Sequence, residues 1–190
     1  MSNISKVSKF IKALLLFIIT LQVSVYIVLF LFATTQGESG EIWFHYLGLS
    51  SGMLMNFNGS WADIAQALVK ENFNPSLILG IPATIPYFLI YYFLYKLFSL
   101  YQQGIIFTVK NSQYIKNIAA VLIAWVVFKL IYPIAVTVVL SFSDMSESLP
   151  LILSIGSEEL VFLLTGLIIY VIAWVMNEAI VLQQEQELII

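Results

Sequence analysis

The sequence has 190 residues, 61% of them hydrophobic and only 10% charged, and its mean hydropathy is +0.96. Soluble domains carry about 25% charged residues, so this composition indicates an integral membrane protein. The absence of cysteine excludes disulfides, thiolate metal sites and cysteine nucleophiles, and a net charge of −3 with no arginine argues against direct nucleic-acid binding.

The first predicted span covers residues 13–34 and follows a start that carries Lys6, Lys9 and Lys12. A hydrocarbon core about 30 Å thick needs roughly 20 helical residues, which this run provides. The apolar core of a signal peptide is shorter, about 7 to 15 residues. We therefore expect an uncleaved span whose N-terminus lies in the cytoplasm.

Residues 35–75 form a polar outer loop that should lie outside the cytoplasm. The aromatic stretch Glu41–Leu47 is typical of a short strand or an interfacial segment, and Met53–Asn58 could pair with it across Gly48–Gly52. Ser60 is a good N-cap for a short amphipathic helix. We expect this helix to lie on the membrane surface or to roof the bundle, because one face is apolar: Ile64, Ala65, Leu68 and Val69.

Three further apolar runs are long enough to span the membrane, at residues 76–99, 117–141 and 159–181. They are separated by a cytoplasmic loop at 100–116, in which Thr108 can cap a new helix, and an outer loop at 142–158. Pro82 and Pro86 lie inside the second span, so we expect a kink there, with the freed carbonyls satisfied by neighbouring helices.

The lysines are distributed unevenly between the two sides of this arrangement. Lys70 falls on the outer side and Lys129 within the membrane, and the other six fall on the inner side: Lys6, Lys9, Lys12, Lys96, Lys110 and Lys116. Such a bias places lysine-bearing loops in the cytoplasm. The sequence therefore predicts an all-α, single-domain, four-helix transmembrane bundle with both termini cytoplasmic and a small extracytoplasmic region of short strands and one amphipathic helix.

Lys129 lies near the middle of the third span with no polar neighbour beside it. A lone ammonium in hydrocarbon costs about 3 kcal/mol on insertion scales, so this side chain should face protein or trapped water. Glu178 is the first candidate partner, and the other polar candidates are Gln22, Tyr91, Tyr132 and Asn177. Two interpretations stay open: a structural pair or neutral lysine in a wet crevice, and a ligand or proton site.

A short motif in the outer loop, Gly48-Leu49-Ser50-Ser51-Gly52, matches the G-x-S-x-G nucleophile elbow. That elbow needs a later histidine, whereas the only histidine, His45, precedes it. One histidine beside two glutamates in a loop is also weak evidence for a metal site. We therefore predict neither an enzyme nor a cofactor.

The fourth span carries small and polar residues at helical spacing, which is more typical of a helix-packing seam than of a substrate path: Gly166, Tyr170, Ala173 and Asn177. Two tryptophans inside the spans, Trp125 and Trp174, are expected to be packing residues. Trp43 and Trp61 fit an interfacial aromatic belt better.

Two inner stretches resemble a family of small four-span bacterial inner-membrane proteins, catalogued as the domain of unknown function two-nine-seven-five. Gly104-Ile105-Ile106-Phe107-Thr108-Val109-Lys110-Asn111 is similar to the family's G-x-I-F-T-x-x-N pattern. Asn177-Glu178-Ala179, followed by Leu182-Gln183-Gln184-Glu185-Gln186-Glu187-Leu188, is similar to its acidic E-G-x-x-L-x-x-E-Q-E-L ending. Departures are Tyr114, Lys116 and Asn177 where the family usually carries arginine, and Ala179 in place of glycine.

The resemblance implies a bacterial inner-membrane location and brings no established reaction. Genes of this family often lie beside one for a small helix-turn-helix regulator, which implies a membrane partner for a transcription factor. We therefore expect a non-enzymatic regulatory or sensory protein that contacts lipids, binds a cytoplasmic protein and could form homo-oligomers. The expected partner-binding residues are Gly104, Ile106, Phe107, Thr108, Asn111, Glu185, Glu187 and Leu188.

Two alternatives concern the same regions. Ile105–Phe107 and Glu187–Ile190 could pair as a two-stranded cytoplasmic ribbon, leaving an edge for a partner strand. The alternative function is that of a small transporter, channel or immunity-type protein that uses a polar crevice around Lys129.

Overall fold

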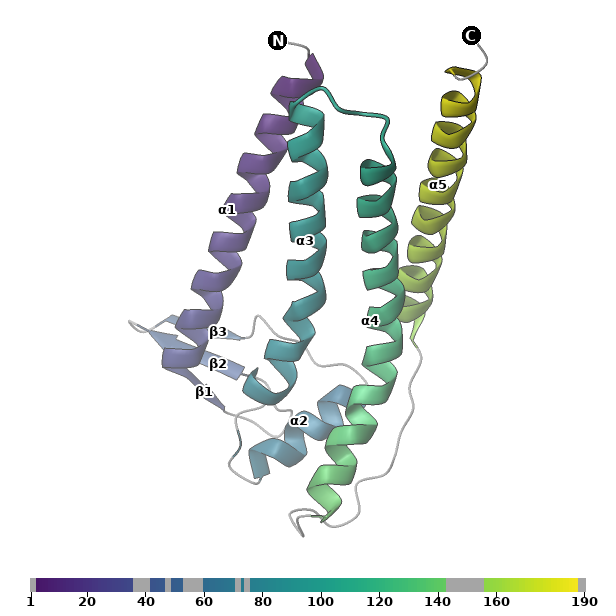
Figure 1. Ribbon diagram of the computed structural model, residues 1–190. Helices are drawn as coiled ribbons and strands as arrows, with labels where there is room; N and C mark the ends of the chain where they lie inside the picture. Colours follow the sequence, from purple (N-terminus) through teal and green to yellow (C-terminus); the bar gives the residue numbers. More distant parts are fainter. Residues whose placement is uncertain are drawn as a thin grey trace. The chain divides into compact units, whose positions relative to one another are not determined.

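The computed structural model describes residues 3–35, 42–46, 49–52, 60–70, 73, 76–142 and 156–187. Four long helices dominate it (Figure 1): α1 (Asn3–Phe32), α3 (Ile81–Gln102), α4 (Val109–Phe142) and α5 (Ser157–Glu187). A π-helical turn, Ser76–Gly80, leads directly into α3. Each of these helices contains a stretch long and apolar enough to cross a membrane, at Ile4–Ile27, Ile78–Gln102, Val109–Phe142 and Ser157–Gln186.

The helices are longer than the apolar runs that predict the spans. α1 begins at Asn3, α4 begins at Val109 and α5 continues to Glu187, so helix replaces most of the loop predicted at 100–116. Hydropathy marks only the part of a helix that suits hydrocarbon. Lysine and glutamine are good helix formers, so the helices extend into the polar flanks.

Three short strands follow α1 and form an antiparallel sheet in the order β1-β2-β3: β1 (Ala33–Thr35), β2 (Ile42–Tyr46) and β3 (Leu49–Gly52). Trp43 is opposite Gly52, and Tyr46 is opposite Leu49. β2 therefore pairs with Leu49–Gly52, the segment expected to form the turn, and the proposed partner Met53–Asn58 lies outside the described residues. A short hairpin connection requires less ordering of the chain than a longer one.

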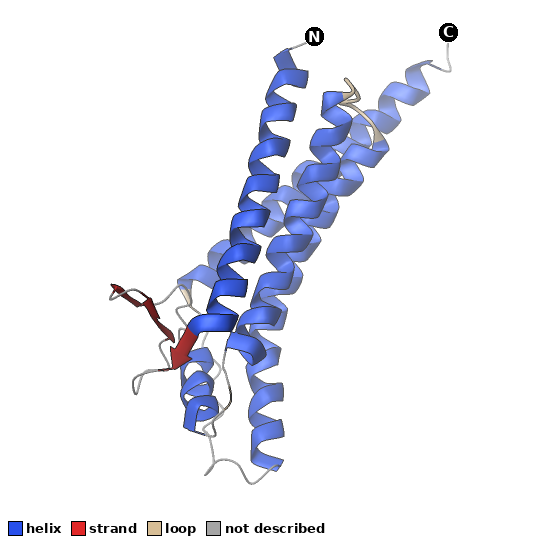
Figure 2. Cartoon of the chain, turned by 90° about the vertical axis from the view of Figure 1, so that its left-hand side faces the viewer, coloured by secondary structure: helices blue, strands red, loops and turns tan. Residues whose placement is uncertain are grey.

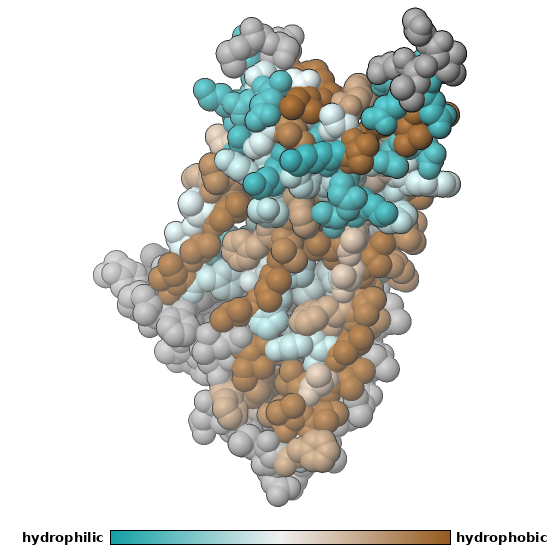
Figure 3. Space-filling view, in the orientation of Figure 1, coloured by the Kyte–Doolittle hydropathy of each residue, from teal (hydrophilic) through white to brown (hydrophobic). Residues whose placement is uncertain are grey.

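Contacts group the chain into two compact units, which we describe separately. The first unit comprises Met1–Thr20, Pro86–Val126 and Ser157–Ile190. In it, α1 contacts α3, α3 contacts α4 through ring pairs such as Phe93 with Tyr114, and α4 contacts α5. Hydrophilic side chains gather at the end of this unit where both termini lie, and apolar side chains cover the helices beyond it (Figure 3).

The second unit comprises Leu21–Ile85 and Val127–Gly156 and includes the sheet and the helix α2 (Ser60–Lys70). Figure 2 shows the strands of the sheet in red and the helices in blue. α2 buries an apolar face made of Trp61, Ile64, Ala65, Ala67 and Leu68. The amphipathic pattern predicted Ile64, Ala65 and Leu68 on this face but not Ala67, and the side chain of Val69 lies outside the described residues. Trp61, which was expected in an interfacial belt, is only 6% exposed.

Candidate functional site

The end of α3 is closed by a Schellman motif centred on Gly104. The N–H of Ile105 donates to the carbonyl of Leu100 at 3.0 Å, and the N–H of Gly104 donates to that of Tyr101 at 3.1 Å. Gly104 has a φ of +80°, in the left-handed region that residues with a side chain rarely adopt. A Cβ there would meet nothing within 4 Å, so the glycine is required by the backbone conformation and not by crowding.

The start of α4 is capped by Thr108, as the sequence predicts. The N–H of Asn111 lies 3.0 Å from the Thr108 carbonyl and 3.4 Å from its Oγ1, and the N–H of Ser112 lies 3.2 Å from the same carbonyl. These bonds satisfy donors that have no partner within the first turn of a helix. Only residues 103–108 separate the two helices, so this connection is short and well bonded.

Asn111 ties the connection to α4. Its side chain is fully buried (0% exposed), and its Nδ2 donates to the carbonyls of Ile105 at 2.9 Å and Ile106 at 2.6 Å. Among the described residues its Oδ1 has no partner. The predicted ribbon of Ile105–Phe107 with Glu187–Ile190 is not confirmed: Ile105–Phe107 are not in a strand, Glu187 belongs to α5, and residues 188–190 lie outside the described residues.

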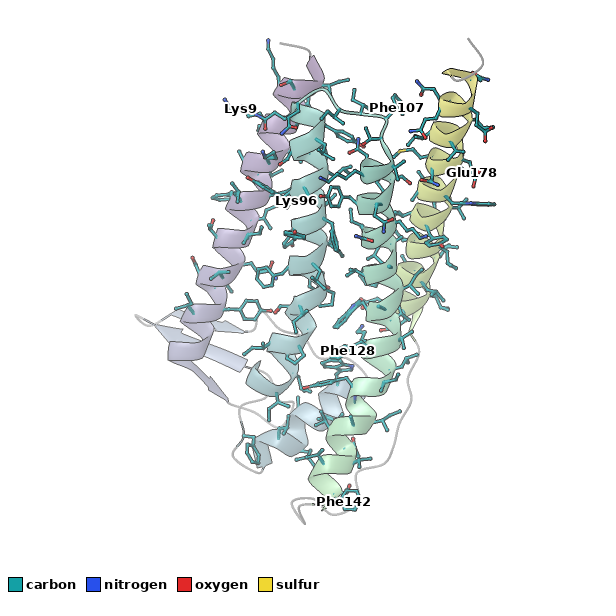
Figure 4. All side chains as sticks on the ribbon, in the orientation of Figure 1. Lys9, Lys96, Phe107, Phe128, Phe142 and Glu178 are labelled. Atoms are coloured by element: carbon teal, nitrogen blue, oxygen red, sulfur yellow. The ribbon has the colours of Figure 1, made fainter. Side chains whose placement is uncertain are left out.

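Phe107 is a motif residue whose side chain is highly exposed. It is 73% exposed, and its neighbours Ile105 and Val109 are exposed too. Figure 4 shows it on the short connection between α3 and α4. Gly104, Thr108 and Asn111 build the turn, Ile106 is half-buried, and the Phe107 side chain is presented at the surface.

α4 and α5 pack antiparallel along the predicted seam, which the structure confirms. The Ser112 hydroxyl donates to the carbonyl of Ala173 at 2.7 Å, and the Lys116 ammonium lies 5.4 Å from the centre of the Tyr170 ring. A Cβ on Gly166 would lie 2.9 Å from Cγ1 of Ile123, so only glycine allows this approach.

Of the two tryptophans predicted to pack inside the spans, Trp125 is buried and Trp174 is exposed. Trp125 is buried on α4 and faces the ring of Tyr87, as expected of a packing residue. Trp174 is exposed on α5, so its predicted packing role is wrong within the described structure. The seam uses another face of α5, on which Ala173 is buried.

The far end of α5 projects past the start of α4. Ala173 lies beside Ser112, only three residues after α4 begins, whereas α5 continues for 14 residues beyond Ala173, about 21 Å. Glu178 and Glu185 are exposed on this projection, Glu187 is its last residue, and Leu188 lies outside the described residues. Figure 4 shows Glu178 near the level of the first turns of α4.

The predicted intramembrane polar residues divide between the two units. Lys129 and Gln22 are half-buried in the second unit, Tyr91 and Asn177 are half-buried in the first, and Glu178 is exposed in the first. Since Lys129 and Glu178 belong to different units, their pairing stays a prediction.

The lysine-bearing start of α1 is held against the end of α3. The Lys12 ammonium donates to Oε1 of Gln102 at 3.1 Å and lies 4.7 Å from the centre of the Tyr95 ring. The Ser5 hydroxyl donates to the carbonyl of Gln102 at 3.1 Å. Lys9 and Lys96 remain exposed on the same end of the unit (Figure 4). The Lys12 ammonium of α1 thus lies against Gln102, the last residue before the connection that carries Phe107.

Sequence reasoning missed a junction in the second unit. The indole N–H of Trp61 donates to the carbonyl of Lys129 at 3.1 Å, and the ring of Trp61 stacks on that of Tyr132 at 5.5 Å. In an α-helix the partner of that carbonyl would be the N–H of residue 133, which proline lacks. The signal in the sequence was Pro133, which marks the carbonyl of Lys129 as one that needs a donor from elsewhere.

A family model described as "Protein of unknown function (DUF2975)" matches residues 60–190. No curated protein and no solved structure matches the chain. The matched region contains α2, α3, α4 and α5, and with them the turn at Gly104 and the acidic end of α5. Since the match covers more than half of the sequence, the chain belongs to this family of proteins of unknown function.

Proposed function

We propose that this chain is a non-enzymatic protein of the bacterial inner membrane that acts as a regulatory or sensory partner of a cytoplasmic protein, such as a small helix-turn-helix regulator. In this proposal the connection 103–108 and both termini face the cytoplasm, because six of the eight lysines lie at that end. The partner binds the connection and the projecting end of α5.

The observation that carries the proposal is the division of roles within the motif. Gly104, Thr108 and Asn111 fix the backbone, and Phe107 is exposed on the turn that they build. Aromatic side chains are frequent anchors of protein interfaces. Because the turn is already fixed, less conformational entropy is lost when a partner binds it.

The charges beside this surface support a protein partner. Lys110 is exposed next to the turn, and Glu178 and Glu185 are exposed on α5. Anionic headgroups attract lysines but repel carboxylates, so an anionic membrane surface would repel the acidic end of α5. Opposite charges on two neighbouring elements give a partner both orientation and selectivity.

The test is site-specific photo-crosslinking in cells that co-express the chain with the regulator encoded by its neighbouring gene. The crosslinking residue replaces Phe107 or, as a control, Phe10, which is 68% exposed on α1. The proposal predicts a chain–regulator adduct from position 107 and little from position 10. Adducts of equal yield, or only lipid adducts at position 107, would contradict it.

A second candidate, a transporter, channel or immunity-type protein, rests on the half-buried Lys129 within a candidate span. Lys129→Met distinguishes the two functions. If the chain is a transporter or channel, loss of the intramembrane ammonium should impair transport. If it is a regulator-binding protein, the variant should keep both the adduct at position 107 and its effect on the regulator.

A further inference from the structure

We propose that Trp61 and Tyr132 form a latch: while α2 is docked, their side chains donate hydrogen bonds to two backbone carbonyls that lie four residues before a proline, that of Lys129 in α4 and that of Ile78 next to α3. Both bonds weaken together when α2 is released. The inference concerns only the second unit and does not depend on the cytoplasmic partner. Four observations carry it: two carbonyls that have a proline four residues ahead, two side chains that supply donors to them, the stacking of those side chains, and the way α2 is attached.

The first site lies in α4. Pro133 is inside this helix and has no N–H, so the carbonyl of Lys129, four residues earlier, loses its helical donor. The indole of Trp61, on α2, supplies the missing hydrogen bond at 3.1 Å. A carbonyl without a donor is costly within a membrane, so this bond favours the docked position of α2.

The second site lies at the start of α3. Pro82 has no N–H, so the carbonyl of Ile78 cannot receive the usual bond from four residues ahead. The phenol of Tyr132, on α4, donates to that carbonyl at 2.5 Å. The backbone there is already irregular, since Ser76–Gly80 form a π-helical turn, a feature found often at functional positions.

The two sites are coupled because their donors touch. The rings of Trp61 and Tyr132 stack with centroids 5.5 Å apart and an interplanar angle of 29°, and the ring of Phe128 also stacks on that of Tyr132, at 4.8 Å. Removal of the indole would therefore free the carbonyl of Lys129 and also remove one wall that orients the phenol. Loss of one donor weakens the other.

α2 is suited to be the moving part. It has 11 residues, too few for a stable isolated helix, so its order depends on the contacts of its buried face. Besides Trp61, the buried face of α2 has two other large side chains, Ile64 and Leu68. Release would free the carbonyl of Lys129 and remove the ring that stacks on Tyr132, so it requires water or a polar ligand that supplies a donor in place of the Trp61 indole.

The test is peptide-level amide hydrogen exchange on the full chain in lipid nanodiscs. Trp61→Phe keeps an aromatic ring and removes only the indole N–H. We expect exchange to rise about three- to tenfold both in residues 134–138 of α4 and in residues 79–85 at the start of α3, the range expected for loss of one hydrogen bond. The control is Trp125→Phe, at another buried tryptophan of α4, which should leave residues 79–85 unchanged.

A second variant keeps the proposal testable if Trp61→Phe proves too unstable. Tyr132→Phe removes the phenol hydroxyl and should raise exchange most in residues 79–85. In the double variant the increases should be non-additive, because the two donors support one another. A response to Trp61→Phe confined to α4, or additive effects in the double variant, would overturn the latch.

Discussion

The side-chain nitrogen of Asn111 lies 2.6 Å from the carbonyl oxygen of Ile106 and donates a hydrogen bond to it. The same nitrogen donates to Ile105, so one buried amide satisfies two consecutive carbonyls of the connection between α3 and α4. This arrangement fixes the backbone before Phe107, whose side chain is exposed at the surface. Most residues of the motif predicted to bind a partner therefore stabilise the turn, and the exposed ring of Phe107 is left to make the contact.

Asn111→Ala should destabilise the fold. It leaves two carbonyls without their donor, and each buried unsatisfied group costs about 1–3 kcal/mol. Asn111→Asp should be worse, since it would also place a buried carboxylate against the two carbonyl oxygens. Denaturant unfolding in detergent, followed by circular dichroism, measures the loss. Gln113→Ala is the control, because Gln113 bonds Asn117 on the exposed face of the same helix and should change stability little; equal losses would argue against the role of Asn111.

Gly104→Ala should cost about 1 kcal/mol, because alanine is strained at a φ of +80° although space for its Cβ is free. Gly104→Asn should cost less, since asparagine tolerates the left-handed region better. The comparison uses the same unfolding measurement. If asparagine proves as harmful as alanine, the backbone conformation is not what requires glycine here.

Gly166→Ala should separate α5 from α4. The new Cβ would lie 2.9 Å from Cγ1 of Ile123 and 3.3 Å from the carbonyl oxygen of Ala119, and overpacking of this kind typically costs about 1–3 kcal/mol. Ile123→Ala removes the closest atom and should restore part of the stability in the double variant. No rescue at all would mean that the contact with Ile123 does not limit the approach.

Lys129→Met and Glu178→Gln should have non-additive effects on stability if the two side chains pair, as the sequence predicts. Loss of either partner alone would leave the other charge uncompensated, whereas the double variant loses both charges. A double-mutant cycle in detergent measures the coupling. Losses that add within about 0.5 kcal/mol would show that the two residues do not interact.

Much of the fold follows from the sequence because membrane insertion imposes simple rules. Each span needs about 20 apolar residues, so hydropathy finds four helices, and Gly104 and Thr108 mark where α3 ends and α4 begins. The seam at Gly166 was also readable, since small residues at helical spacing permit close approach.

The parts that the sequence did not predict depend on tertiary partners. Tryptophan is common at membrane interfaces, so the sequence suggested that role for Trp61. Only the proximity of α4 makes Trp61 the donor for the carbonyl of Lys129. Asn111 likewise looked like one motif residue among several, until the positions of Ile105 and Ile106 gave its amide two acceptors. Residues that bond distant backbone atoms carry no periodic signal.

Orientation has its own test. Reporter fusions after Ser60 and after Ile190 should report opposite sides of the membrane, with the C-terminal reporter in the cytoplasm, because lysines are retained on that side. If both reporters lie on one side, or if the C-terminal reporter is outside, the surface around Phe107 is not cytoplasmic.

The central claim is that Phe107 anchors a cytoplasmic partner. The most direct measurement is the affinity of the purified neighbouring-gene regulator for the full chain in nanodiscs, with Phe107→Ser compared with Phe10→Ser at a similarly exposed phenylalanine. Loss of an aromatic anchor of about 2 kcal/mol or more predicts at least a roughly 30-fold weaker complex for Phe107→Ser. Phe10→Ser should bind as the unmodified chain does. Equal affinities for all three proteins would contradict the account.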